Sequence, residues 1–293
     1  EQGMGQLKEY LSRVKQTPGL AEEAGIFIGL AYKLTWRDEA GLEFMMGLDK
    51  SLTDHVLVNY LMASSASFAY ENDMALKKLR KINRDRIQIV FGGMDYLYGR
   101  CLLNRLDPGA NIPLEKYLAT YPGMDYKKDV CNRLSWHYFL QGDLARYNEY
   151  KMMVSTTGRS LRDRDLEALE ESRSVYLPHI GLLKARLLFD GGYFSEADSV
   201  MRGIPAATLS PVPYQLEFSY RAGRIAQMLG NTDRASMDLK KTVEDGAGEP
   251  FTFATRAALQ LGVIFENKKD YPNALFWYKR CLEIYDGAHT VES

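Results

Sequence analysis

The sequence predicts an all-α fold, arranged as a superhelix (an α-solenoid) of about seven helix-turn-helix pairs, and three observations predict it. Apolar residues recur at three- and four-residue spacing through segments of about 12 to 16 residues, which is the period of an amphipathic helix. Short breakers rich in Gly and Pro separate these segments, and strand signals are scarce. Several neighbouring segments also share one spacing of small residues, which indicates a repeat.

The N-terminal segments pair in sequence order. Each pair consists of two apolar-periodic segments joined by a short turn, which predicts antiparallel neighbours. The first segment, 7–14, resembles the second helix of a pair whose first half is missing. The paired segments are 20–34 with 38–48, 54–70 with 72–82, and 94–106 with 113–120.

The C-terminal segments show the clearest spacing. A small residue in the middle of one helix is followed twelve residues later by an Ala in the next helix. Two antiparallel helices approach to about 8 Å only if both carry small residues where they cross. A degenerate copy of this repeat starts at Ser135, and upstream of Ser135 the twelve-residue spacing fades. The predicted structural repeat positions are Ala185 with Ala197, Gly223 with Ala235, and Gly262 with Ala274.

The last copy resembles the tetratricopeptide repeat (TPR) family, whose pattern spreads Leu-Gly, Tyr, Ala, Phe and Ala over about 34 residues. Gly262, Ala274 and Tyr278 match that pattern, whereas Ala258 stands where the family has Trp. The resemblance implies a TPR-like, right-handed superhelix. The amino-acid sequence of residues 183–193 also resembles that of a group of TPR proteins from the Bacteroidetes. This resemblance implies a bacterial origin but no particular activity.

Repeat spacing divides the chain into four predicted parts. The step from Ser135 to Ala185 is 50 residues, whereas the next two steps are 38 and 39, so an insertion is expected there. Its acids alternate with Arg162 and Arg164, and we interpret it as a solvated helix with internal ion pairs. The parts are degenerate TPR-like helix pairs over 1–121, a degenerate TPR over 122–155, an inserted charged helix and linker over 156–178, and three TPR repeats over 179–293.

Composition excludes several functional classes. The 293 residues carry 37 Lys+Arg and 38 Asp+Glu, so the formal net charge is -1 and no overall basic field favours nucleic acid or anionic lipid. The three cysteines are too few and too scattered for a disulfide framework or a zinc site. The longest apolar stretch is far shorter than the roughly 20 residues of a membrane helix. Because the chain starts at Glu1 without Met, we expect a processed product, periplasmic or exported, with a cytoplasmic protein as the alternative.

No set of residues predicts catalysis, a metal or a cofactor. The four histidines, at positions 55, 137, 179 and 289, lack a second ligand at helical spacing, and neither a nucleophile elbow nor a phosphate-binding loop occurs. The basic run 77–86 offers RNA binding as an alternative, but no aromatic residues interleave its charges. We therefore interpret it as a solvated face, with Leu76, Leu79 and Ile82 toward the core.

The first helices of stacked repeats are expected to form one concave inner wall. Arg and aromatic side chains, which dominate binding hot spots, fall on it. The sequence therefore predicts a non-enzymatic scaffold that binds a protein or peptide, with acidic or carboxylate groups of the partner at Arg186 and Arg224. An exported protein that holds a small ligand or glycan, and a helical-repeat enzyme, are the alternatives. The predicted partner-binding residues are Trp136, His179, Arg186, Tyr220, Arg224 and Arg256.

Overall fold

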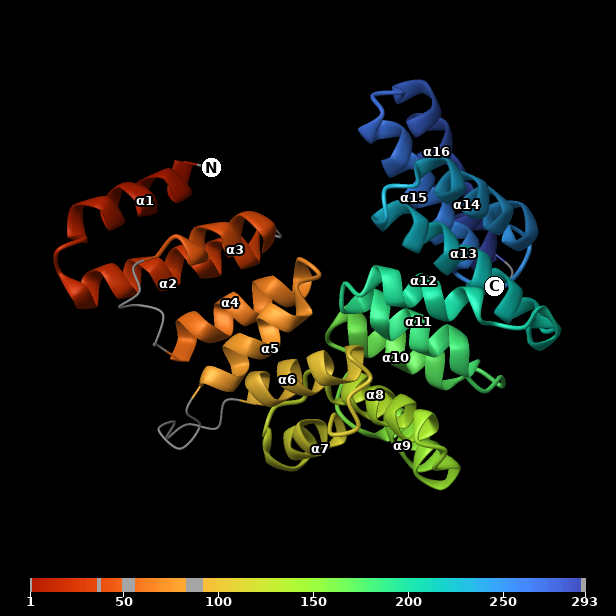
Figure 1. Ribbon diagram of the computed structural model, residues 1–293, viewed down its shortest axis with the longest axis horizontal. Coiled ribbons are helices and arrows are strands. Elements are labelled where there is room, and N and C mark those ends of the chain that lie inside the picture. Colours follow the sequence, from red (N-terminus) through yellow and green to blue (C-terminus); the bar gives the residue numbers. More distant parts are fainter. Residues whose placement is uncertain (1, 36–37, 49–55, 83–91, 291–293) are drawn as a thin grey trace. The chain divides into compact units, whose positions relative to one another are not determined.

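The computed structural model describes residues 2–35, 38–48, 56–82 and 92–290 (Figure 1). Sixteen α-helices and one short 3-10 helix form the regular structure of these parts, which contain no β-strand. The helices pack as sequential pairs, so the predicted all-α class is confirmed. The chain divides into two compact units: unit 1 is Glu1–Tyr176 with Asp190–Gly192, and unit 2 is Leu177–Phe189 with Tyr193–Ser293. None of the helices in the described ranges is both long and apolar enough to cross a membrane.

Unit 1 holds four helix pairs and two additional helices. Helix α1 packs on α2, and α10 packs on both α8 and α9. The pairs are α2 with α3, α4 with α5, α6 with α7 and α8 with α9. The bounds are α1 (Gln2–Val14), α2 (Pro18–Leu34), α3 (Asp38–Met46), α4 (Val56–Phe68), α5 (Asn72–Lys81), α6 (Gly92–Asn104), α7 (Asn111–Thr120), α8 (Lys127–Leu140), α9 (Leu144–Thr156) and α10 (Asp163–Ser172).

Unit 2 holds the remaining three pairs, which brings the number of pairs in the described residues to the predicted seven. Helix α14 also packs against α15, so consecutive pairs share a core. A 3-10 helix, Ala206–Leu209, precedes the second pair. The bounds are α11 (Ile180–Asp190, with its last residue in unit 1), α12 (Phe194–Arg202), α13 (Val212–Met228), α14 (Thr232–Gly246), α15 (Phe253–Asn267) and α16 (Tyr271–Thr290).

Small residues lie where the helices of unit 2 cross. A Cβ atom at Gly223 would lie 2.7 Å from Cγ of Leu239, and one at Gly262 would overlap the ring of Tyr278. Leu239 and Tyr278 both follow their glycine by sixteen residues. The Ala197 and Ala235 side chains are fully buried, and so is that of Ala185. The close approach of the two helices therefore depends on the absence of a larger side chain.

The same spacing continues into unit 1, where the sequence pattern predicts that it fades. A Cβ atom at Gly29 would lie 2.9 Å from Sδ of Met45, again sixteen residues further on. Gly41 follows Gly29 by the same twelve residues. Ala63 and Ala75, also twelve apart, are both fully buried. The spacing was missed because Met45 does not resemble a TPR residue, although its position is equivalent.

Two of the turns within helix pairs share one local structure, a glycine with positive φ followed by a residue that caps the next helix. Gly142 and Gly230 adopt positive φ values of 80° and 77°, a conformation that favours glycine after a helix. The next residue then caps the following helix: Asp143 accepts a hydrogen bond from the Arg146 amide at 3.0 Å, and Asn231 accepts one from the Arg234 amide at 3.1 Å. These turns fix where the second helix of each pair begins.

Candidate functional site

Three consecutive first helices of unit 2 contribute to one aromatic and cationic surface. The guanidinium carbon of Arg224 on α13 lies 5.2 Å from the ring centroid of Phe189 on α11. Tyr220, one turn before Arg224, lies 5.8 Å from Phe253 at the start of α15. We call the surface formed by these four residues and Gln227 the Arg224 wall. It has the composition that the sequence predicts for a concave first-helix face.

Unused hydrogen-bonding groups distinguish this wall. The Nε of Arg224 and the Oε1 of Gln227 are buried without a partner, although both residues are only half-buried overall. Nη1 of Arg224 donates a long hydrogen bond, 3.4 Å, to the Tyr220 hydroxyl. Arg224 has no carboxylate at ion-pair distance in the described part of the chain. Buried donors and acceptors without partners cost about 1–3 kcal/mol each, so their accumulation at one place needs an explanation.

Glu217, seven residues before Arg224 on the same helix, forms its contacts with another arginine. Its Oε1 accepts a hydrogen bond from Nε of Arg221 at 2.7 Å and forms an ion pair with Nη2 of the same residue. Arg221 and Arg224 therefore differ although they belong to the same helix: the first is neutralised within α13 and the second is not.

The other predicted partner-binding residues of unit 2 fall into different environments. Arg186 on α11 is half-buried, and Arg256 on α15 is exposed. His179 lies at the N-terminus of α11, where its Nδ1 accepts hydrogen bonds from the amides of Gly181 and Leu182 at 3.2 and 3.3 Å. Its Nε2 lies 2.9 Å from the Thr208 hydroxyl. His179 thus caps a helix, a role that the sequence analysis did not assign to it.

Trp136 belongs to unit 1, and its placement differs from the open face that the sequence analysis expected. The residue is 5% exposed. The guanidinium carbon of Arg133 lies 5.6 Å from its ring centroid. An aromatic residue on the first helix of a degenerate repeat looks the same in the sequence whether it faces solvent or the core.

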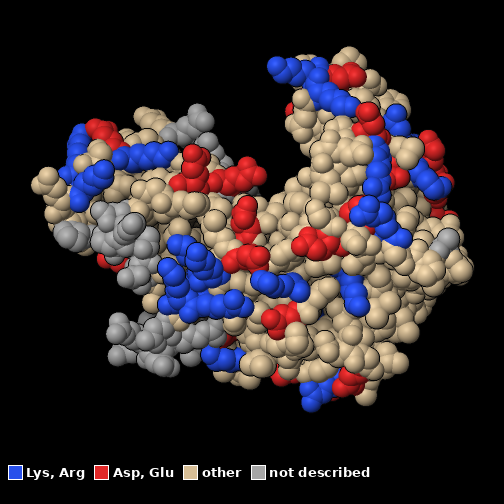
Figure 2. Space-filling view, viewed as in Figure 1, with Lys and Arg blue, Asp and Glu red and all other residues tan. Residues whose placement is uncertain are grey.

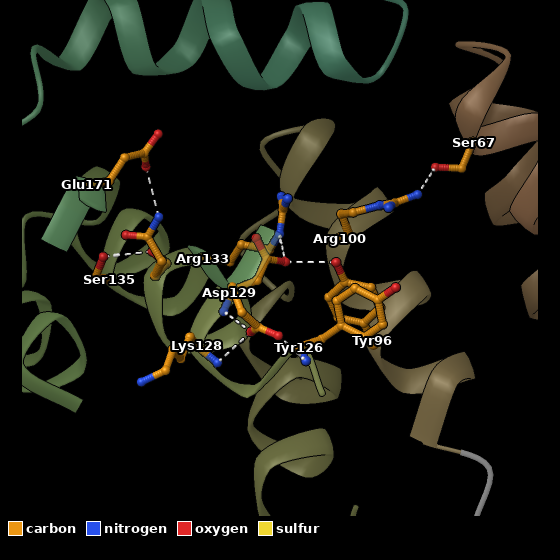
Figure 3. A network of polar contacts seen from close by, with 11 residues as sticks. Ser67, Tyr96, Arg100, Tyr126, Lys128, Asp129, Arg133, Ser135 and Glu171 are labelled. Carbon is orange, nitrogen blue, oxygen red and sulfur yellow. Dashed lines mark hydrogen bonds and ion pairs between the residues drawn. The ribbon is translucent and has the colours of Figure 1, made fainter. Parts of the chain in front are cut away.

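A buried polar network occupies the middle of unit 1 (Figure 3). Asp129 on α8 accepts hydrogen bonds at its Oδ2 from Nε of Arg133 at 2.7 Å and from the Tyr96 hydroxyl at 2.8 Å. Tyr96 comes from α6. Arg100, one turn later on α6, donates from Nη2 to the Ser67 hydroxyl at 2.6 Å. The network therefore joins α4, α6 and α8 by contacts between residues more than thirty positions apart.

Asp165 connects the inserted helix α10 to the same network. Its carboxylate accepts hydrogen bonds from the amides of Tyr126, Lys128 and Asp129 at 2.8, 3.1 and 3.2 Å. It caps the N-terminus of α8, where those amides have no partner within the helix. The residue is 0% exposed, so the interpretation of α10 as a solvated helix is wrong at this position. The charged run gave no sign that one of its acids is buried.

The electrostatics of the network are those of a fixed support and not of a proton-transfer site. Burial and the Asp129 charge raise the pKa of Tyr96 to about 12. Burial would raise the pKa of Asp129, but Arg133, Arg164 and the two hydrogen bonds outweigh it and lower that pKa. Neither group titrates near neutrality, where a general acid or base needs its pKa.

Other candidate sites in the described residues give weaker support for a function. No group of three His, Cys, Asp or Glu side chains there could hold a metal ion, and His55 lies outside the described residues. Cys101, Cys131 and Cys281 are free thiols. The described part of the basic run, residues 77–82, forms a patch over α5 (Figure 2), with Leu76, Leu79 and Ile82 buried as predicted. A recess of about 560 Å³ at the turns near Asn231 and Lys268 includes no residue of the Arg224 wall.

Comparisons with known proteins find a distant likeness among solved structures. No protein-family model and no curated protein matches the sequence. Among solved structures, the chain is similar to the apo form of the quorum sensor NprR from B. thuringiensis, with 14% sequence identity and a TM-score of 0.38. The match covers 96% of this chain and 82% of that chain.

Proposed function

We propose that this chain is a non-enzymatic, TPR-like helical scaffold that binds a peptide segment of a partner protein against the Arg224 wall. The observation that supports this proposal is the contrast within α13. Arg221 is paired with Glu217, whereas the half-buried guanidinium of Arg224 has no carboxylate partner in the described residues. A carboxylate from the partner would supply the missing charge through charge-assisted hydrogen bonds.

The wall also offers what a peptide backbone needs. Arg224 Nε is an unused donor and Gln227 Oε1 an unused acceptor, three residues apart and therefore neighbours on one helix face. A residue of an extended segment presents its own N–H and C=O on the same side, so one residue of a bound peptide could satisfy both atoms after small side-chain movements. Phe189, Tyr220 and Phe253 would supply the apolar contact.

The contact residues that we propose are Arg186, Tyr220, Arg224 and Arg256. Half-buried Arg186 and exposed Arg256 lie on the first helices on either side of α13, so they could extend the contact along the partner. The same wall fits a peptide better than a catalytic role, because it contains no nucleophile next to a base and no acid pair.

A peptide array tests the proposal directly. Twelve-residue peptides are arrayed in matched pairs, one with Asp and Glu and one with Asn and Gln at the same positions, and probed with the full chain. We expect retention of acidic members, and fluorescence anisotropy on the best of them should show at least about tenfold weaker binding by Arg224→Ala, which corresponds to about 1.4 kcal/mol.

The matched control is Arg280→Ala, which removes an exposed arginine of α16 that pairs with Glu283. It should bind like the unmodified chain, and both variants should keep its melting temperature. If amide members bound as well as acidic ones, or if Arg224→Ala bound unchanged, the Arg224 wall would not be the binding site.

A further inference from the structure

Three cations from three helices of unit 1 surround one aromatic ring, that of Phe68 at the end of α4. Lys33 Nζ on α2 lies 3.9 Å from the ring centroid. The guanidinium carbons of Arg100 on α6 and Arg164 on α10 lie 5.2 and 5.7 Å from it. These residues are distant in the sequence, and no charge run marks the cluster that they form.

The negative charge near this cluster is already used. Nε of Arg133 donates a hydrogen bond to the carboxylate of Asp129. Figure 3 shows the guanidinium groups of Arg100 and Arg133 on the same side of Asp129. Burial lowers the pKa of Arg133, but the charges of Asp129 and Asp190 outweigh it and raise that pKa. In the described parts of unit 1, neither Arg100 nor Arg164 has a carboxylate at ion-pair distance.

Two further observations indicate a missing anion. Nη1 of Arg133 is buried without a hydrogen-bond partner, in a residue that is only 4% exposed. Arg100 is 5% exposed, and burial together with the nearby Arg164 charge lowers its pKa, so its surroundings oppose its positive charge. A cation–π contact contributes less free energy than the burial of an ion without a counter-ion costs.

We propose that the cluster around Phe68 is a binding site for a phosphate group, held by Arg100, Arg164 and Nη1 of Arg133. Two guanidinium charges without an acid match the double negative charge of a phosphate, and planar guanidinium groups match its oxygens. Half-buried Phe68, Lys33 and Arg164 leave the cluster reachable from solvent. The site belongs to unit 1 and is independent of peptide binding at the Arg224 wall.

The test is thermal unfolding of the full chain in inorganic phosphate, O-phosphoserine, acetate or chloride at equal ionic strength and pH 7.5. A ligand that binds the folded state raises the melting temperature with its concentration. We expect phosphate to raise it by several degrees more than chloride or acetate. A larger shift with inorganic phosphate would indicate the free ion as the ligand, and a larger shift with phosphoserine would indicate a phosphate monoester.

The decisive variant is Arg164→Gln, because Arg164 makes no ion pair or hydrogen bond of its own in the described structure. Without ligand, this variant should stay folded, since it removes both the repulsion on Arg100 and the attraction to Asp129, while its phosphate affinity should fall at least about tenfold. Arg162→Gln is the matched control: it removes an exposed arginine two residues earlier that pairs with Asp125, and it should keep the phosphate response.

Three results would overturn the phosphate site. They are equal shifts in phosphate and chloride, an undiminished phosphate response in Arg164→Gln, and a stronger response to acetate than to phosphate. A fourth, loss of the response in Arg162→Gln but not in Arg164→Gln, would move binding away from Phe68.

Discussion

In unit 2, the buried polar side chains among the described residues are Asp198, Ser219 and Thr242. Unit 1 buries five charged side chains in one network, those of Arg100, Lys128, Asp129, Arg133 and Asp165. Both units are built from the same helix pairs with the same twelve-residue spacing of small residues. The units therefore differ in how many charged side chains they bury: unit 2 buries Asp198, which pairs with Arg234 of the next helix pair, whereas unit 1 buries a whole network.

This difference has an energetic consequence. An apolar contact loses free energy in proportion to the surface removed, so single substitutions in unit 2 should have graded effects. A buried charge that loses its partner keeps its full desolvation cost. Unit 1 should therefore respond much more sharply to the loss of one carboxylate than unit 2 does.

The largest effect is expected for Asp129→Ala. The change leaves Arg133 buried without its acid and the Tyr96 hydroxyl without an acceptor. Breaking a buried pair in this way costs about 3–5 kcal/mol of the free energy of unfolding. Urea unfolding followed by far-UV circular dichroism measures this loss, and hydrogen exchange assigns it to unit 1.

The control in unit 2 is Asp245→Ala, which removes one member of the exposed ion pair with Lys241. Exposed pairs contribute about 0–1 kcal/mol, so the change should be small. Replacing both partners, as in Asp129→Leu with Arg133→Met, should recover part of the loss. Equal losses for Asp129→Ala and Asp245→Ala would remove the proposed distinction between the units.

A smaller effect is expected when the two unusual helix caps are compared. Asp165→Ala leaves three amides at the start of α8 without an acceptor, so we expect a loss of about 3 kcal/mol. His179→Ala removes a cap from the start of α11 and should cost about 1 kcal/mol. Hydrogen exchange at the amides of Lys128 and Leu182 reports each cap separately. A greater loss for His179→Ala would mean that α10 only covers α8 and does not support it.

The origin of these contacts explains how much the sequence could predict. Pairing, turn positions and the small residues of unit 2 follow from spacings of twelve residues or fewer, so the all-α class and seven pairs were predictable. Asp165 contacts amides 36 to 39 positions away, and Arg100 contacts Ser67 across 33. No local period marks such partners, so α10 was interpreted as solvated.

The residues of the candidate site also divide into those that the sequence could predict and those that it could not. Tyr220 and Arg224 were found because equivalent positions on repeated first helices were expected to share a face. Phe189 and Phe253 were missed as parts of that wall because they lie at the end and start of their helices. His179 looked like a wall residue, but capping depends on the turn geometry before α11, which the sequence pattern does not reveal.

The most graded effects on stability are expected where the helices of a pair cross. Gly262→Leu places a side chain where Tyr278 already lies, and overpacking of this kind costs about 1–3 kcal/mol. Gly29→Leu meets Met45, whose flexible thioether side chain can move aside, so its cost should be lower. Gly5→Leu in α1 is the matched control, because nothing lies within 4 Å of its Cβ position and Leu favours helix over Gly by roughly 1 kcal/mol. Urea unfolding should therefore order the variants Gly262→Leu, Gly29→Leu and Gly5→Leu from least to most stable. Adding Tyr278→Ala should restore part of the stability of Gly262→Leu, and a failure of both the order and the rescue would mean that bulk at the crossing does not limit how closely the helices pack.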